Sequence, residues 1–243
     1  MKVVVIIPAA GLGTRMVSAG TRAKKSVPSK QFTELGGIPI LFHTLRKFAA
    51  HPRVAEILVA LRKDEIAGFR ERLEAEGKDI LQKQVQLIEG GEHRQESVAN
   101  AIRAVSAAPD DVILVHDAVR PFVTAEIIDE VIDAAQKHGA AIAGMPAVDT
   151  IKQVERTADG ALIKATIPRE RVVMAQTPQG FRYHILKKAF DDAAADGFTG
   201  TDEASLVERS GGAVTVVMGS PRNLKITTPS DMELAEFYLR GRA

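Results

Sequence analysis

The sequence predicts an α/β protein: a doubly wound, mostly parallel sheet with helices on both faces and a projecting β-hairpin arm. First, short β-branched runs alternate with longer amphipathic segments, which is typical of a parallel sheet with crossover helices. Second, most of these runs are apolar nearly throughout, as in strands that are covered on both faces. Third, one polar segment with an Asp-Gly pair interrupts the alternation, and Asp-Gly is a hairpin-turn signal.

The predicted elements follow one another in a regular order along the chain. The expected strands are Val3–Ile7, Ile57–Leu61, Val85–Ile88, Val112–Val115, Ala140–Pro146, Val172–Ala175 and Val214–Met218. The expected helices are Ile40–Ala50, Glu65–Glu76, Gln95–Ala107, Ala125–His138, Tyr183–Ala195, Asp202–Ser210 and Pro229–Arg240. The last helix has the clearest start, because Thr228 suits an N-cap, Pro229 suits the first helical position and Asp231 falls in the first turn.

The hairpin is expected over residues 150–167, where Thr150–Arg156 and Ala161–Ile167 flank Asp159-Gly160. Both arms are half polar, so neither suits a central strand. Two interpretations stay open: a surface hairpin, or a dimerisation arm that reaches a neighbouring subunit. The sequence has no internal repeat and no Ser- or Pro-rich linker, so we expect residues 1–243 to form a single domain that carries this arm.

Composition excludes several classes of protein. The chain has 243 residues, of which 45% are hydrophobic and 26% charged, which is ordinary for a globular protein. Cysteine is absent, which excludes a disulfide scaffold, a thiolate metal site and a cysteine nucleophile. A net charge of +1 argues against a nucleic-acid partner that covers the whole surface. The six histidines show no metal-ligand spacing, and we expect them to be structural or solvated.

The N-terminal apolar run is better explained as a buried strand than as a signal peptide, because it breaks at Pro8 and passes into a glycine-rich loop. No apolar stretch approaches the roughly 18 residues that a membrane span needs. We therefore expect a cytoplasmic protein without a membrane partner.

The loop after the first strand suits a nucleotide. Gly11 and Gly13 let backbone amides approach a phosphate, and small Ala9 and Ala10 leave room for a flat base. A dinucleotide fingerprint fails because Met16 takes the place of its last glycine, and a P-loop fails because no glycine precedes Lys25. A tight strand-to-helix turn without a ligand is the simpler alternative.

Two cations accompany this loop. Arg15 lies two residues beyond Gly13, and Lys30 follows downstream in Pro28-Ser29-Lys30-Gln31-Phe32. Cations beside a phosphate nest suit displacement at phosphorus, where negative charge spreads over the equatorial oxygens. These residues predict phosphoryl or nucleotidyl transfer.

Further polar motifs follow other strands, and ligands of doubly wound sheets bind outside the carboxyl ends of the strands. Gly90-Gly91 with Ser97 follows Val85–Ile88, and Asp117 follows Val112–Val115. An acid at that place suits Mg²⁺, which prefers oxygen ligands. A capped helix start and a buried, hydrogen-bonded Asp are the alternatives without a ligand.

These motifs resemble the nucleotidyltransferases, and most closely the 2-C-methyl-D-erythritol 4-phosphate cytidylyltransferase family of the non-mevalonate isoprenoid pathway. The resemblance rests on residues 9–16, on Lys30-Gln31-Phe32, on Leu35–Leu41 and on the later motifs, which occur in the family's order over almost the whole chain. It implies transfer of CMP from CTP to the acceptor phosphate with release of pyrophosphate and with Mg²⁺ as cofactor. A cytidylyltransferase for another polyol phosphate, such as ribitol 5-phosphate, a sugar-nucleotide pyrophosphorylase and a non-catalytic nucleotide-binding module remain as alternatives.

The resemblance also implies roles for individual residues. Catalytic roles fall on Arg15, Lys30, Arg169 and Lys225. Nucleotide contacts fall on Ala9, Ala10, Gly11, Gly13, Gly91, Glu92, Ser97, Asp117 and Ala118, with Asp117 also holding the metal. Substrate contacts fall on Arg120, Thr150, Thr177 and Thr201, and Thr150 and Arg169 would act from the partner subunit of a homodimer. The loop from Met16 to Lys30 is longer than is usual in the family, so Lys24 and Lys25 compete with Lys30 for its role.

Overall fold

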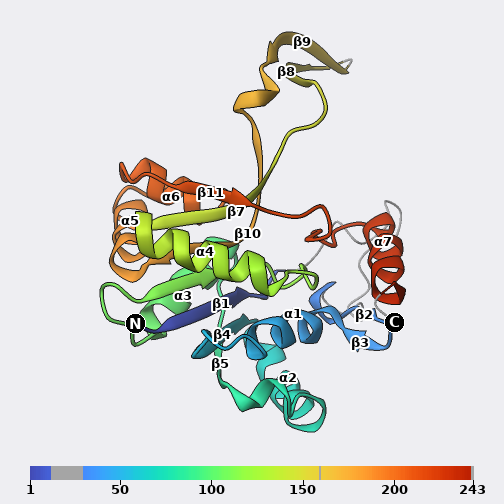
Figure 1. The fold of residues 1–243 in the computed structure, drawn as a ribbon, viewed down its shortest axis with the longest axis vertical. Helices are drawn as coiled ribbons and strands as arrows, with labels where there is room; N and C mark the ends of the chain where they lie inside the picture. Colours follow the sequence, from blue (N-terminus) through green and yellow to red (C-terminus); the bar gives the residue numbers. More distant parts are fainter. Residues whose placement is uncertain (12–29, 159, 242–243) are drawn as a thin grey trace.

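A central sheet of seven strands organises the computed structural model, which describes residues 1–11, 30–158 and 160–241. The strand order is β11-β7-β10-β6-β1-β4-β5 (Figure 1). These strands are β1 (Val3–Pro8), β4 (Glu56–Leu61), β5 (Gln84–Glu89), β6 (Val112–Val115), β7 (Ala140–Pro146), β10 (Val173–Arg182) and β11 (Thr215–Met218). All neighbours are parallel except β10, which runs antiparallel to both β6 and β7.

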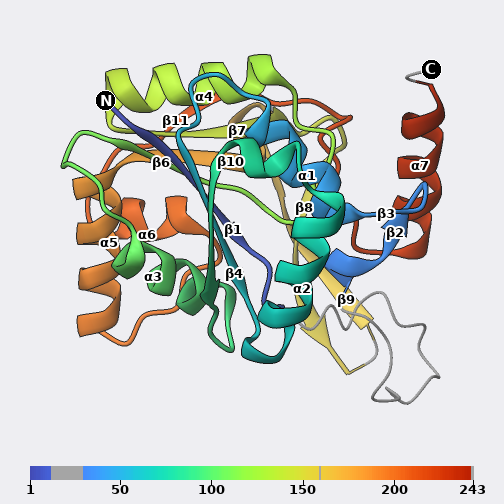
Figure 2. The same cartoon turned by 90° about the horizontal axis from the view of Figure 1, so that it is seen from below.

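Helices cover both faces of this sheet, so the doubly wound prediction is confirmed (Figure 2). One face packs against α1 (Ile40–Ala49), α2 (Lys63–Glu76) and α4 (Ala125–His138). The other packs against α3 (Arg94–Ala104), α5 (Tyr183–Ala195) and α6 (Glu203–Arg209). Side chains of β1 alternate between the faces: Val5 lies in the first core and Ile6 in the second, and both are fully buried.

The last helix, α7 (Pro229–Arg240), stands apart from these two layers (Figure 1). Its Ala235 packs in a small third core with Leu35, Phe122 and Ile226. The side chain of Thr228 accepts a hydrogen bond from the amide of Asp231, as expected for the N-cap. In the part of the chain that the structure describes, no helix is long and apolar enough to cross a membrane.

The strand predicted over Val172–Ala175 is the one prediction of an element that falls well short, because β10 continues to Arg182. Its pairing with β7 shifts between Ala175 and Gln179, a stretch that includes the cis peptide bond before Pro178. Proline lacks the N–H that a regular ladder needs, so Gln-Thr-Pro-Gln has the pattern of a turn rather than of a strand interior. Other short elements of the described residues were not predicted: the strands β2 (Glu34–Leu35) and β3 (Ile38–Pro39), and the 3₁₀ segments η2 (Lys30–Phe32), η3 (Ile80–Gln82) and η4 (Arg169–Arg171).

The predicted hairpin is present as β8 (Ile151–Thr157) and β9 (Gly160–Ile167), which form a separate two-stranded sheet. Figure 1 shows it well beyond the body of the molecule, joined through the ends of β7 and β10. Apolar side chains are exposed on it, among them Val154, Leu162 and Ile163. A hairpin of this kind, on its own in water, buries too little apolar surface to be stable.

Candidate active site

A cavity of about 210 Å³ lies at the carboxyl ends of β1 and β6, where a doubly wound sheet binds its ligands. Eight of the predicted site residues line it: Ala9, Ala10, Gly11, Lys30, Ser97, Asp117, Ala118 and Lys225. Pro8, Gln31, Arg94 and Val119 complete its described lining. Residues from five separate stretches of the chain therefore meet at one edge of the sheet.

Gln31 fixes the position of Lys30 at the cavity. The Gln31 amide nitrogen donates to the carbonyl oxygen of Ala9 over 2.6 Å, and the side chain is buried. This hydrogen bond ties the 3₁₀ segment Lys30–Phe32 to the loop that follows β1. Lys30 thus lies beside the alanines predicted to accept the base, whereas Gly13, Arg15, Lys24 and Lys25 lie outside the described residues.

Asp117 is the electrostatic centre of the site. Its Oδ1 lies 3.3 Å from Nε of Arg94, and its Oδ2 lies 3.2 Å from Nε of Arg120 and 2.9 Å from Nζ of Lys225. Burial alone would raise the pKa of the Asp117 carboxyl, but Arg94, Lys225 and Arg120 together hold that pKa far below its usual range. Asp117 is therefore a permanent anion within a cluster of cations.

A buried chain of hydrogen bonds holds the backbone of Asp117. Its amide donates to Thr177 Oγ1 over 3.0 Å, and Thr177 Oγ1 lies 3.2 Å from Nδ1 of His116. Nε2 of His116 lies 3.0 Å from the carbonyl oxygen of Arg120. Because a carbonyl can only accept, Nε2 carries the proton and Nδ1 accepts from the Thr177 hydroxyl.

His116 is a neutral structural histidine, one of the two roles expected for the histidines of this chain. Burial lowers its pKa to about 4, against the opposing effect of its hydrogen bond to the Arg120 carbonyl. Phe48 packs edge-on against the imidazole, with ring centroids 4.8 Å apart. The ring thus supports Asp117 and Arg120 without adding a charge.

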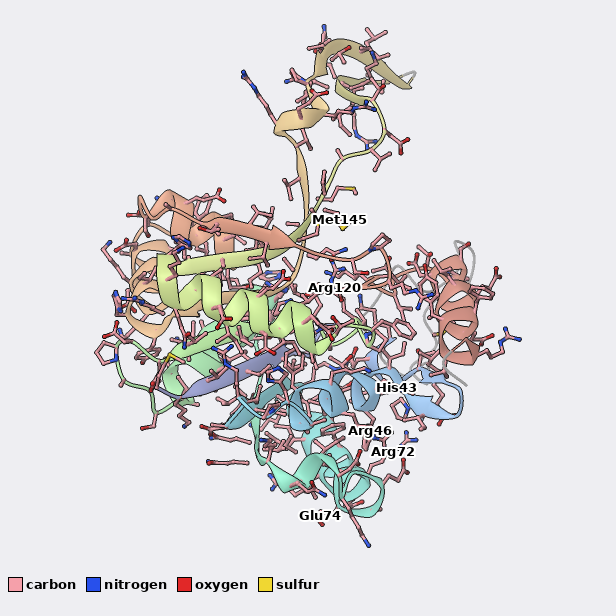
Figure 3. All side chains as sticks on the ribbon, viewed as in Figure 1. His43, Arg46, Arg72, Glu74, Arg120 and Met145 are labelled. Carbon is pink, nitrogen blue, oxygen red and sulfur yellow. The ribbon has the colours of Figure 1, made fainter. Side chains whose placement is uncertain are left out.

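Arg120 is buried behind Asp117 rather than exposed to the cavity. Its Nη1 donates to the carbonyl oxygen of Asn223 over 2.7 Å, and burial lowers the pKa of its guanidinium although Asp117 opposes this shift. Asn223 in turn donates to the carbonyl oxygen of Thr177 over 2.8 Å. Figure 3 labels Arg120 within the body of the molecule. It also labels Met145, near the end of β7, where the chain leaves the sheet for the hairpin.

The glycine pair after β5 approaches the cavity closely. A Cβ on Gly90 would come within 2.5 Å of the Ala10 Cβ and 2.9 Å of Ser97 Oγ, so a larger residue would push the two loops apart. The Gly91 amide donates to Ser97 Oγ over 3.1 Å. Glu92 is exposed, and its amide donates to Glu96 in the first turn of α3.

The remaining predicted residues lie away from this cavity. Thr201 lines a smaller neighbouring cavity of about 110 Å³, which shares Arg94 with the first. Thr150 is exposed at the start of the hairpin, and Arg169 follows its second strand, with Nη1 donating to the carbonyl oxygen of Val148 over 2.8 Å. One copy of the chain does not bring Thr150 and Arg169 to Asp117.

Sequence reasoning missed several residues of the site, among them the polar residues Gln31, Arg94 and Glu203. Arg94 joins Asp117 to Glu203, whose Oε1 and Oε2 lie 2.7 and 2.9 Å from Nη1 of Arg94. Arg94 stands in the Gly-Gly-Glu-His-Arg stretch and Glu203 in Thr-Asp-Glu-Ala-Ser, so both belong to motifs that already marked the site. Arg94 and Glu203 are more than a hundred residues apart in the sequence, and no local sequence pattern predicts that they pair.

Comparison with known proteins agrees with this geometry. The family model for 2-C-methyl-D-erythritol 4-phosphate cytidylyltransferase matches residues 3–241. The chain is similar to the protein of that name from Acidobacterium capsulatum, with 57% identity over 100% of this chain and 99% of the relative. It is 53% identical to the one from Solibacter usitatus over 100% of this chain and 98% of the relative.

Solved structures give the same result. The crystal structure of 2-C-methyl-D-erythritol 4-phosphate cytidylyltransferase from Thermus thermophilus superposes with a TM-score of 0.76 at 34% identity, covering 99% of this chain and 100% of that one. The 4-diphosphocytidyl-2C-methyl-D-erythritol synthase from Anaerococcus prevotii reaches a TM-score of 0.79 at 28% identity, covering 98% of each chain. With the cavity, its cations and this match along the whole length, the chain belongs to the 2-C-methyl-D-erythritol 4-phosphate cytidylyltransferase family.

Proposed function

We propose that the protein transfers CMP from CTP to 2-C-methyl-D-erythritol 4-phosphate, which gives 4-diphosphocytidyl-2-C-methyl-D-erythritol and pyrophosphate. The observation that carries this proposal is the cluster of Lys30, Arg94 and Lys225 around a cavity bounded by Ala9–Gly11, in a chain of this family. Such a site suits the transfer of a nucleotidyl group between two phosphates.

The acceptor phosphate is the nucleophile. One of its oxygens attacks the α-phosphorus of CTP in line, and the bond from that phosphorus to the bridging oxygen of pyrophosphate breaks. A phosphate is already an anion, so the attack needs no general base. Lys30 and Arg15 stabilise the charge that develops on the α-phosphate, because preorganised cations act strongly where charge appears in the transition state.

The nucleotide lies against the loops at the strand ends. Ala9, Ala10 and Gly11 line the triphosphate and base, and Gly91, Ser97 and Ala118 approach the nucleoside. The proposed contact of Gly13 falls outside the described residues. The side chain of Glu92 is exposed beside this loop, whereas its amide already donates to the Glu96 carboxylate. The small side chains leave the volume that a flat base requires.

The acceptor approaches from the side of Lys225 and Thr201. Of the three cations beside Asp117, Lys225 has the most exposed side chain, at 35% against 29% for Arg94 and 10% for Arg120. Arg120 and Thr177 act on the acceptor through Asp117, because their polar atoms are already engaged there. Thr150 and Arg169 of a second copy complete the acceptor site, which requires a homodimer formed through the hairpin.

Magnesium fits this site only together with the triphosphate. The described residues contain no group of three carboxylates or histidines that could hold a metal, and both oxygens of Asp117 face cations. Mg²⁺ commonly takes one or two carboxylates and completes its shell with phosphates and water. Asp117 would supply one such oxygen, and the ion would neutralise charge on the triphosphate.

A pyrophosphate-release assay tests the function. We expect release with CTP, Mg²⁺ and 2-C-methyl-D-erythritol 4-phosphate, and at least tenfold less with ribitol 5-phosphate. If CTP binds but no acceptor gives pyrophosphate release, the protein is a non-catalytic nucleotide-binding module instead.

The role of Arg15 is tested by Arg15→Ala in the same assay. We expect kcat to fall on the order of 10²–10³-fold, as when one preorganised donor to a transition state is lost. Arg70→Ala, on the exposed surface of α2, is the matched control and should leave turnover unchanged. Near-normal turnover of Arg15→Ala would contradict the catalytic assignment.

A further inference from the structure

Glu203 is a buried carboxylate that the proposed chemistry does not use. It begins α6, its side chain is 1% exposed, and burial raises its pKa against the opposing attraction of Arg94. A buried charge is costly unless it is paired and hydrogen-bonded. Here Nη1 of Arg94 satisfies both carboxylate oxygens, at 2.7 and 2.9 Å.

Arg94 links this carboxylate to the reactive cavity. Its Nη1 is held by Glu203 on α6 while its Nε faces Oδ1 of Asp117 at the end of β6. The same side chain lines both the cavity with Lys30 and the smaller one with Thr201. A guanidinium is planar and rigid, so fixing one end of it also fixes the direction in which Nε points.

The cations around Asp117 differ in what else holds them. Arg120 is held by Asn223 and is buried, and Arg94 is held by Glu203. Lys225, with one flexible ammonium group 2.9 Å from Oδ2, is the more exposed member of the cluster. An arriving phosphate competes with Asp117 for the ammonium of Lys225, and it competes better when the other cations stay on Asp117.

We propose that Glu203 is a positioning residue: by holding Arg94, it fixes a permanent counter-charge on Asp117 and so releases Lys225 to bind a phosphate of the reacting substrates. Without Glu203, Arg94 would be free to swing toward the incoming phosphate, and Asp117 would retain Lys225 instead. The inference rests on the proposed function, because turnover is what the test measures. Its mechanism rests on the contacts that join Glu203, Arg94, Asp117 and Lys225.

The test is Glu203→Gln, which keeps the shape of the side chain and removes its charge. We expect kcat to fall at least tenfold, whereas the Kd for CTP, measured by calorimetry, changes less than threefold. The control is Glu56→Gln, because Glu56 is another buried carboxylate paired with a cation, Lys2, at the opposite end of the sheet. It should lower the melting temperature comparably and leave kcat unchanged.

A double-mutant cycle separates positioning from a general structural effect. If Glu203 acts through Arg94, then Arg94→Lys combined with Glu203→Gln should lower kcat no further than the worse single variant. Additive losses, or a Glu203→Gln variant with normal kcat, would overturn the inference. Should Glu203→Gln not fold, Glu203→Asp keeps the charge with a shorter reach, and an unchanged kcat there would overturn it equally. Turnover of the wild-type protein in the same experiment tests the proposed function, independently of how the variants behave.

Discussion

At the scale of single residues, the site depends on balanced charge. Asp117 carries one negative charge among Arg94, Arg120 and Lys225, and Glu203 balances Arg94 from behind. The near-neutral total charge of the chain gives no sign of this local excess of cations. A triphosphate is the kind of ligand that such an excess attracts.

Replacing Asp117 with Asn should destabilise the free protein and strengthen its stabilisation by metal-free CTP. Removing one partner of a buried ion pair leaves the others uncompensated, so we expect a loss of about 3 kcal/mol in the free energy of unfolding. The triphosphate then supplies the missing negative charge. Urea unfolding measures the first effect, and the rise in melting temperature with CTP in EDTA measures the second.

The control for this prediction is Asp110→Asn, because Asp110 pairs with Arg182 and His184 at the exposed surface. It should change the free energy of unfolding by less than about 1 kcal/mol. Equal CTP-induced rises in melting temperature for wild type and Asp117→Asn would refute the charge-balance argument.

At the scale of elements, the sequence predicts most helices and strands, because local patterns define them. The bounds of α4, α5, α7, β6 and β7 agree with the predicted ranges. The prediction fails in β10, where Pro178 interrupts the strand pattern and only pairing with β6 and β7 shows that the strand continues. In the site, motifs mark Asp117 and Ser97, whereas the contact of Arg94 with Glu203 depends on tertiary folding.

The opposite end of the sheet offers a prediction for pH. Asp111, just before β6, accepts hydrogen bonds from the amides of Lys2 at 2.7 Å and Ala108 at 2.8 Å. Burial would raise the pKa of Asp111, but these amides lower it below its usual value. Such a carboxylate adds stability above the pKa it has when unfolded, and this stability is lost as the pH falls through its lowered folded pKa.

Asp111→Asn should therefore lower the free energy of unfolding by about 1–3 kcal/mol at pH 7, as expected for a buried hydrogen-bonding group that is altered. The difference from wild type should start to shrink as the pH falls below about 4, where the unfolded carboxyl takes up its proton, and it should become small once folded Asp111 is protonated too and resembles Asn. Urea unfolding between pH 7 and pH 3 measures this, with exposed Asp64→Asn as control. A difference that does not depend on pH would contradict the assignment.

At the scale of the whole molecule, the hairpin is the part that a single copy leaves unexplained. It projects from the body, exposes Val154, Leu162 and Ile163, and carries Arg169 at its base, away from Asp117. A second copy would cover the apolar residues and receive Arg169 in its acceptor site. Deleting Thr150–Ile167 should accordingly give a monomer with weak acceptor binding, and an unchanged mass in light scattering would argue against the dimer.

Mixing two inactive variants tests whether each site is built from two chains. Arg169→Ala and Lys225→Ala should each be nearly inactive alone. In a mixed dimer, one of the two sites would carry both lesions and the other neither, so an equal mixture should recover up to about a quarter of wild-type activity. If each chain formed its own complete site, mixing would restore nothing.

The antiparallel strand β10 connects the hairpin directly to the site. The strand starts at Val173, at the foot of the hairpin, and passes Thr177 before it reaches its pairing with β6 at Gln179. Thr177 Oγ1 accepts a hydrogen bond from the amide of Asp117. Thr177 lies between Ala175 and Gln179, where the pairing of β10 with β7 is interrupted. A partner that bound the hairpin would therefore act, along this one strand, on the residue that holds the backbone of Asp117, and its binding would be coupled to the arrangement of the cations.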